Sequence, residues 1–159
     1  MIWPGNYIYN YKHCMKLLHA VGAGLAGAVV LTVTHQLLHK VFKDAPRMDL
    51  IGEEAVTKLA DKADVHIPEK NLYGVTMAGD IVANTLYYTL AALSKSKAAT
   101  MRGGLLGLIA GIGGVALPKH LRLNNAYSNR TPATRLMTTA IYTLGGLVSG
   151  KVLKALSTR

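Results

Sequence analysis

Cysteine and acidic side chains are scarce in this chain. Its 159 residues include one cysteine and eight aspartates or glutamates. The single cysteine, Cys14, excludes an internal disulfide and a CxxC metal or redox pair. Seven of the eight acidic residues lie between residues 44 and 69, and Asp80 is the eighth. Outside that one segment the chain is therefore almost without negative charge.

Charged residues of both signs make up only 16% of the chain, and they gather between long apolar runs. A soluble domain contains roughly 25% charged residues, so this pattern is typical of a membrane protein. The net charge of +10 is compatible with nucleic acid. However, the sequence has no basic stripe with interleaved aromatic residues and no nucleic-acid-binding motif. The lysines and arginines instead flank the apolar runs, where they fix topology and meet the head groups of the lipid bilayer.

Four apolar, glycine-rich stretches predict membrane-spanning helices, each of which needs about 20 residues to cross the hydrocarbon layer. They cover residues 17–38, 72–93, 101–118 and 136–156. The chain is therefore predicted to be all-α. We expect a polytopic bundle of four transmembrane helices that forms one unit over residues 17–156.

The connector over residues 41–71 is predicted to contain an amphipathic helix over residues 50–63. Apolar residues recur there every four positions, and acidic and basic residues fill the remainder. Pro46 interrupts any helix that continues from the first span, and Asp49 is a suitable N-cap. Because this helix is acidic, we expect it to dock on protein rather than on anionic lipid.

Residues 1–16 are expected to form an N-terminal interfacial tail, since they lack the pattern of a signal peptide. Met15 is an alternative start of the chain. Four spans would place both termini on one side of the membrane. The density of lysine and arginine then favours the cytoplasmic side of an inner or plasma membrane for both termini.

Small residues recur at four-residue spacing in three of the stretches. This spacing lets helix backbones approach closely in lipid, whereas glycine in a soluble helix costs about 1 kcal/mol. The predicted packing residues are Gly24, Ala28, Gly103, Gly107, Gly111, Gly146 and Gly150.

The second stretch carries the one carboxylate that stands within an apolar run, Asp80. A charge at membrane depth costs roughly 2.5–3.5 kcal/mol on the mild insertion scales, so an intramembrane acid is a candidate functional group. Asn84, Tyr87 and Tyr88 share its helix face at three- and four-residue spacings. Two interpretations are open. The face is either a proton or cation site on a polar transport path, or an interhelical hydrogen bond that holds the bundle together.

Three histidines form a second candidate site, a metal centre. His35 and His39 are four residues apart at the end of the first span, and His120 follows the third. Because odd-numbered spans end on the same side, all three are expected at the interface nearer Asp80. Imidazole and carboxylate suit a metal ion, and histidines on different helices can hold haem. No established metal-binding motif accompanies them.

The sequence favours a non-enzymatic function, because no serine stands in a GxSxG context and no other nucleophile arrangement is present. Glycine faces left over after packing within the chain would favour a homo-oligomer or a larger membrane complex. The predicted function is an oligomeric or accessory subunit of a membrane assembly, without a cofactor. One alternative is a small transporter or channel with a polar path at Asp80 and Asn84. The other is a metal- or haem-binding redox subunit.

Overall fold

The computed structural model describes the backbone of residues 4–93 and 98–157, and the side chains of residues 15–93 and 98–157. Within these ranges every regular element is helical, which confirms the predicted all-α class. The elements are α1 (Pro4–Val41), α2 (Met48–Lys62), α3 (Glu69–Thr89), the 3-10 helix η1 (Leu90–Ala92), α4 (Ala99–His120), α5 (Ala126–Asn129) and α6 (Pro132–Ser157).

Three helices in the described residues are long and apolar enough to cross a membrane, namely α4, α6 and the segment Met15–Val41 of α1. The predicted span over residues 72–93 corresponds to α3 and η1, which fall outside this set. Asp80, Asn84 and a charged first turn lower the apolar content of α3. Length and composition therefore support three of the four predicted spans.

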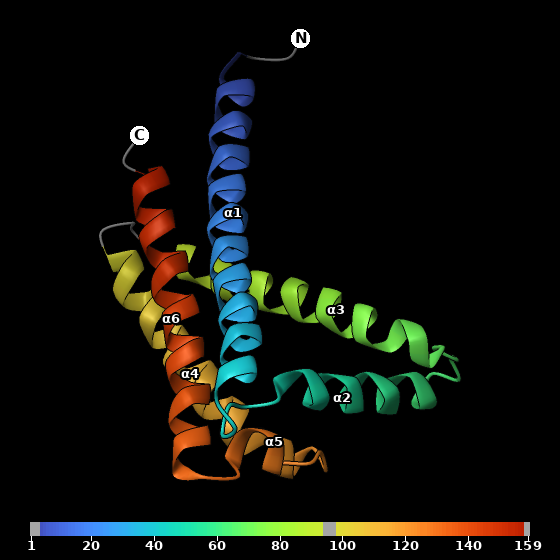
Figure 1. Cartoon of the computed structure of the whole chain (residues 1–159). Coiled ribbons are helices and arrows are strands. Elements are labelled where there is room, and N and C mark those ends of the chain that lie inside the picture. The colour runs from blue at the N-terminus through green and yellow to red at the C-terminus, as the bar shows by residue number, and fades with distance from the viewer. Residues whose placement is uncertain (1–3, 94–97, 158–159) are drawn as a thin grey trace.

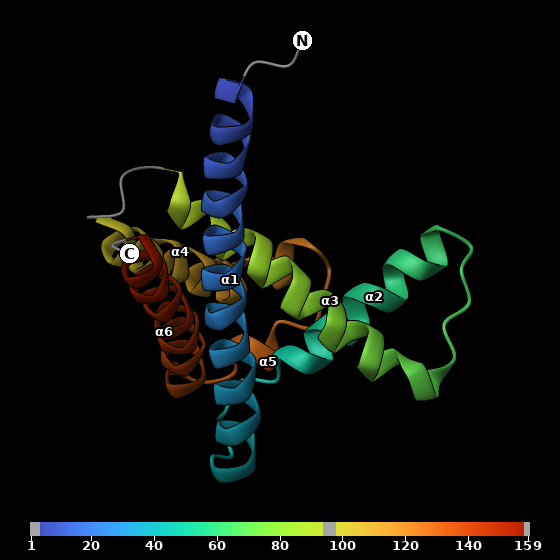
Figure 2. The same ribbon diagram turned by 90° about the horizontal axis from the view of Figure 1, so that it is seen from above.

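The three candidate spans lie together, and α3 leaves them at a steep angle (Figure 1). The most extensive contact joins α4 to α6, and α1 packs against both α6 and α3. In both views α2 and α3 project to one side of the other helices (Figures 1 and 2). α2 and α5 lie at the end of the molecule where α1 and α4 end and α6 begins.

Glycine backbones make the contact between α4 and α6. A Cβ atom on Gly103 would overlap the carbonyl oxygen of Gly146, and one on Gly107 would overlap the carbonyl oxygen of Tyr142. A Cβ atom on Gly111 would lie 2.6 Å from the Cα atom of Thr139. These clashes are with backbone, so no side-chain rotation could relieve them.

The small residues of α1 face two different neighbours. Gly24 lies against the backbone of Thr85 on α3, whereas a Cβ atom on Gly27 would lie 2.6 Å from the carbonyl oxygen of Gly145 on α6. Ala28 is completely buried between them. Close approach of backbones is the geometry by which small residues hold helices together in lipid.

One prediction about a helix end is wrong. The N-cap residue of α2 is Arg47, and Asp49 lies within the first turn, so the predicted N-cap role of Asp49 is wrong. Residues 4–16 of the expected tail are helical and continuous with the rest of α1. Asp64 and Arg122 have left-handed φ angles of 54° and 58° just beyond α2 and α4, as helix-ending motifs require.

Candidate binding cavity between α1, α2 and α3

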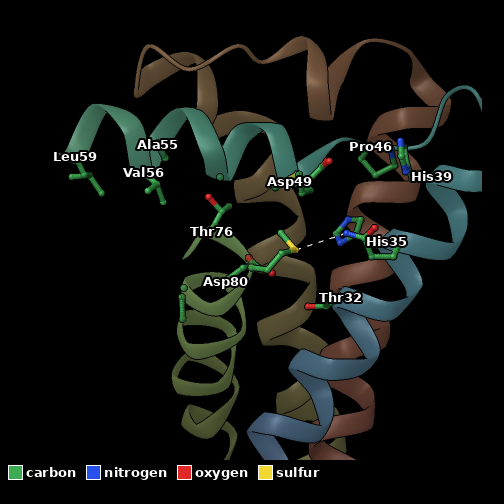
Figure 3. Close-up of a pocket in the computed structure, with 16 residues that line it drawn as sticks. Thr32, His35, His39, Pro46, Asp49, Ala55, Val56, Leu59, Thr76 and Asp80 are labelled. Carbon is green, nitrogen blue, oxygen red and sulfur yellow. Dashed lines mark hydrogen bonds between the residues drawn. The ribbon is translucent and has the colours of Figure 1, made fainter. Parts of the chain in front are cut away.

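A cavity of about 190 Å³ lies where α1, α2 and α3 meet. Figure 3 shows Thr32 and His35 on α1 and Asp80 on α3 around one space, with α2 across the top. One water molecule needs a cavity volume of roughly 10–15 Å³, so this cavity has room for a small molecule. Most of the remaining lining is apolar and comes from α2 and α3, with Met48, Ala55, Val56, Met77 and Ala83 among its residues.

Asp80 is half-buried in the wall of this cavity. The side-chain amide of the buried Asn84 donates to Oδ1 of Asp80 and to its backbone carbonyl oxygen, both at 2.9 Å. No lysine, arginine or histidine forms an ion pair with Asp80 in the part of the chain that the structure describes. Its carboxyl group therefore has an amide neighbour and no cationic one.

Three other lining residues, Thr32, Thr76 and His35, carry buried polar atoms without a hydrogen-bond partner among the described residues. Thr76 is only 3% exposed, and its hydroxyl is unpaired. The Nε2 atom of His35 is also unpaired, and its ring packs edge-on against Tyr142 with 5.8 Å between the ring centroids. Buried polar groups normally find a partner, so unpaired ones beside a cavity call for an explanation.

Asp49 also lines the cavity, but its charge is already compensated. Arg47 donates to both carboxylate oxygens of Asp49, with Nη2 2.8 Å from Oδ2 and Nε 3.0 Å from Oδ1. Burial of the Asp49 carboxyl group opposes its ionisation, but the hydrogen bonds and charge of Arg47 and the backbone N–H of Leu50 outweigh that effect. The pKa of Asp49 therefore lies below its ordinary value.

α2 lies above the cavity, where it packs against α3 and makes polar contacts with the connector between α4 and α6. The backbone N–H of Asn124 donates to Oε2 of Glu54 at 2.8 Å, and Lys58 donates to Oε1 at 2.7 Å. The same two hydrogen bonds hold the pKa of Glu54 below its ordinary value. At the start of α2, the backbone N–H of Arg47 donates to the carbonyl oxygen of Tyr127 at 2.8 Å.

Of the predicted polar face, Asp80 lines the cavity and the two tyrosines point elsewhere. The hydroxyl of Tyr87 donates to the carbonyl oxygen of Leu106 on α4 at 2.9 Å. The hydroxyl of Tyr88 donates to the carbonyl oxygen of Tyr142 on α6 at 2.7 Å. Both tyrosines therefore link α3 to other helices.

The structure brings two of the three predicted metal-binding histidines to the cavity and leaves out the third. His35 and His39 line it together with Asp80, whereas His120 is exposed at the end of α4. No three His, Cys, Asp or Glu side chains lie close enough to hold a metal ion in the described ranges. α1 and α4 end at the same end of the molecule, as predicted, but His120 is not among the residues of the cavity.

Sequence reasoning did not find Thr32, Gln36, Thr76 and Asp49 as cavity residues. A signal for the first two was present, because Thr32, His35, Gln36 and His39 are spaced as one face of a helix. Nothing in the sequence placed that face opposite α2. No match to this chain is found among protein-family models, curated proteins or solved structures.

The depressed pKa of Asp49 predicts a stability contribution that acid removes. Replacing Asp49 by asparagine should lower the free energy of unfolding by about 1 kcal/mol at pH 7, since a partly exposed ion pair contributes little more. The ordinary pKa of an aspartate is about 3.9. Because the folded-state pKa is lower, the contribution is complete above that value and is lost as the pH falls through the folded-state pKa.

Thermal unfolding of both proteins in detergent at pH 7 and in acid measures the effect. The two curves should converge in acid, while Asp61→Asn, at an exposed position on α2, should follow the wild type throughout. A constant difference between Asp49→Asn and wild type at every pH would contradict the ion-pair explanation.

Proposed function

We propose that this protein is an integral membrane protein that acts as a non-enzymatic subunit of a membrane assembly, built from further copies of itself. Large apolar side chains are exposed along the outer faces of α1 and α4, which supports contact with lipid. They include Leu25, Val29, Val33, Leu105, Ile109 and Ile112. We include α3 as a fourth membrane helix, because Val75, Val82 and Leu86 repeat this exposure on its outer face.

One contrast carries the proposal: the glycines at which α4 and α6 meet are covered, whereas Gly74 and Gly79 of α3 are open. Gly103 and Gly107 already contact the backbone of α6. A Cβ atom on Gly74 or Gly79 of α3 would have no heavy atom within 4 Å. Ala78, four residues after Gly74, is exposed too.

An open small-residue face on a membrane helix favours association with another helix, because backbones that approach closely gain van der Waals contact that lipid does not supply. The outer face of α3, defined here by Gly74, Ala78 and Val82, meets this condition. Most homo-oligomers have closed symmetry, so we expect α3 to pair with α3 of a second copy about a two-fold axis.

Native mass measurement of the purified full chain in mild detergent tests this assembly. The wild type should give a mass that is a multiple of one chain. Ala78→Leu should weaken association by about tenfold or more, equivalent to about 1.4 kcal/mol, because leucine keeps the backbones apart. The fold of one chain should survive, since the Ala78 side chain is exposed.

Gly22→Leu is the matched control, because Gly22 is also exposed and open but lies on α1. This variant should keep the wild-type mass. A monomeric wild type, or equal effects of the two substitutions, would contradict self-association through α3. A stable complex with a different protein would show that α3 pairs with that protein and not with a second copy of this chain.

A further inference from the structure

Beyond assembly, we propose that the cavity between α1, α2 and α3 binds a primary organic ammonium ion. Its nitrogen would lie at Asp80, and its hydrocarbon chain would lie against α2. The same site would also serve a transporter, which the sequence leaves open as an alternative function. We propose binding alone.

The charge of the lining supports a cation. No lysine or arginine is among the described residues that line the cavity, and two aspartates are. Arg47 neutralises Asp49, so the uncompensated carboxyl group is that of Asp80. A carboxylate that is half-buried at membrane depth without a cationic partner is costly, and a proton or a bound cation relieves that cost.

The hydrogen-bonding groups match an ammonium ion. A primary ammonium group has three N–H donors and no acceptor. Asp80 has one carboxylate oxygen, Oδ2, that Asn84 does not use. Thr32 and Thr76 add two buried hydroxyls, and His35 adds a buried ring nitrogen, all without partners in the described residues. These groups supply at least the three acceptors that the three N–H donors of an ammonium ion require.

The rest of the lining favours an organic cation over a metal ion. Hard metal ions take six or more oxygen ligands, and zinc takes four ligands from His, Cys, Asp or Glu. The described residues offer no group of three such side chains. Met48, Val56 and Met77 instead provide apolar surface beside Asp80, against which a short hydrocarbon chain would be removed from water.

Such an ammonium group has two sources, a free amine or the head group of an ethanolamine lipid. The two share the chemistry that Asp80 would recognise. They differ in whether the membrane itself supplies the ligand, and lipid composition distinguishes them.

Butylammonium chloride is the probe, titrated calorimetrically against the full chain in nanodiscs of phosphatidylcholine. We expect saturable binding of butylammonium and none of 1-butanol, which has the same hydrocarbon chain without the charge. Asp80→Asn should weaken binding by about tenfold or more, a loss of about 1.4 kcal/mol. Asp61→Asn is the control, because this carboxylate lies on α2 and is exposed, and it should leave the affinity unchanged.

Val56→Trp is the second variant, since it fills the cavity and leaves Asp80 in place. It should abolish binding even if Asp80→Asn fails to fold. Adding phosphatidylethanolamine to the nanodiscs should lower the apparent affinity for butylammonium if the lipid is the natural ligand, and leave it unchanged if a free amine is. Equal binding of butylammonium and butanol, or full binding by Asp80→Asn or Val56→Trp, would overturn the inference.

Discussion

Gly107→Ala is expected to prevent the chain from reaching its folded state, although it adds a single methyl group. The added Cβ atom would overlap the carbonyl oxygen of Tyr142 and lie 2.7 Å from the Cα atom of Thr143. Overpacking of movable side chains costs about 1–3 kcal/mol. Here both obstacles are backbone atoms of α6, so the clash is relieved only if α4 and α6 separate. We therefore expect the free energy of unfolding to fall by more than that range.

Gly113→Ala on the same helix is the matched control. The nearest atom to a Cβ there is the Leu117 side chain at 3.4 Å, so the substitution should be tolerated and gains helix propensity. Yield and size-exclusion profile of the two variants in detergent measure the difference. Equal behaviour of the two variants would show that the α4–α6 contact has little to do with stability.

Tyr88→Ala is the second change with a large expected effect. Tyr88 is 1% exposed, and its side chain lies among α1, α3 and α6, close to Gly27 and Gly145. Its truncation should lower the free energy of unfolding by about 3–5 kcal/mol, because it removes a large buried ring and leaves a cavity. Tyr88→Phe keeps the ring and loses only the hydrogen bond to Tyr142. It should lower the free energy of unfolding by about 1 kcal/mol.

Tyr73→Ala gives the reference for a tyrosine of α3 outside the core. Tyr73 is 49% exposed, and its hydroxyl accepts one hydrogen bond from Gln36. The free energy of unfolding should therefore change by no more than about 0.5 kcal/mol. Denaturant titration measures the free energy of unfolding of all three variants and so gives their order of stability. If Tyr88→Ala were no more destabilised than Tyr73→Ala, α3 would not be anchored through Tyr88.

Much of the fold follows from composition and spacing. Long apolar runs without acid predict helices of membrane length, and the spacing of Gly103, Gly107 and Gly111 marks one face of α4 for close contact. The spacing does not say which helix covers that face. It also does not distinguish the covered face of α4 from the open face at Gly74 and Ala78, because that depends on how the helices are arranged.

The candidate site was predictable only in part. Asp80 and His35 stood out as polar groups in apolar runs, and the order of the helices placed them at the same end of the molecule. The cavity depends on α2, whose position rests on contacts such as Glu54 with Asn124 that join residues far apart in the sequence. Topology could place His120 at the end of the molecule that holds His35 and His39, but not on one side of α4, because it gives depth along a helix and not direction around it.

The cavity has walls and a roof that are attached to different parts of the molecule. Its walls are α1 and α3, whereas its roof, α2, is bound at Arg47 and Glu54 to the connector between α4 and α6. Because α2 also packs against α3, a tilt of α4 and α6 relative to α3 would have to break one of these two sets of contacts. Access to Asp80 therefore depends on contacts that α2 makes with two parts of the molecule, α3 and the connector between α4 and α6.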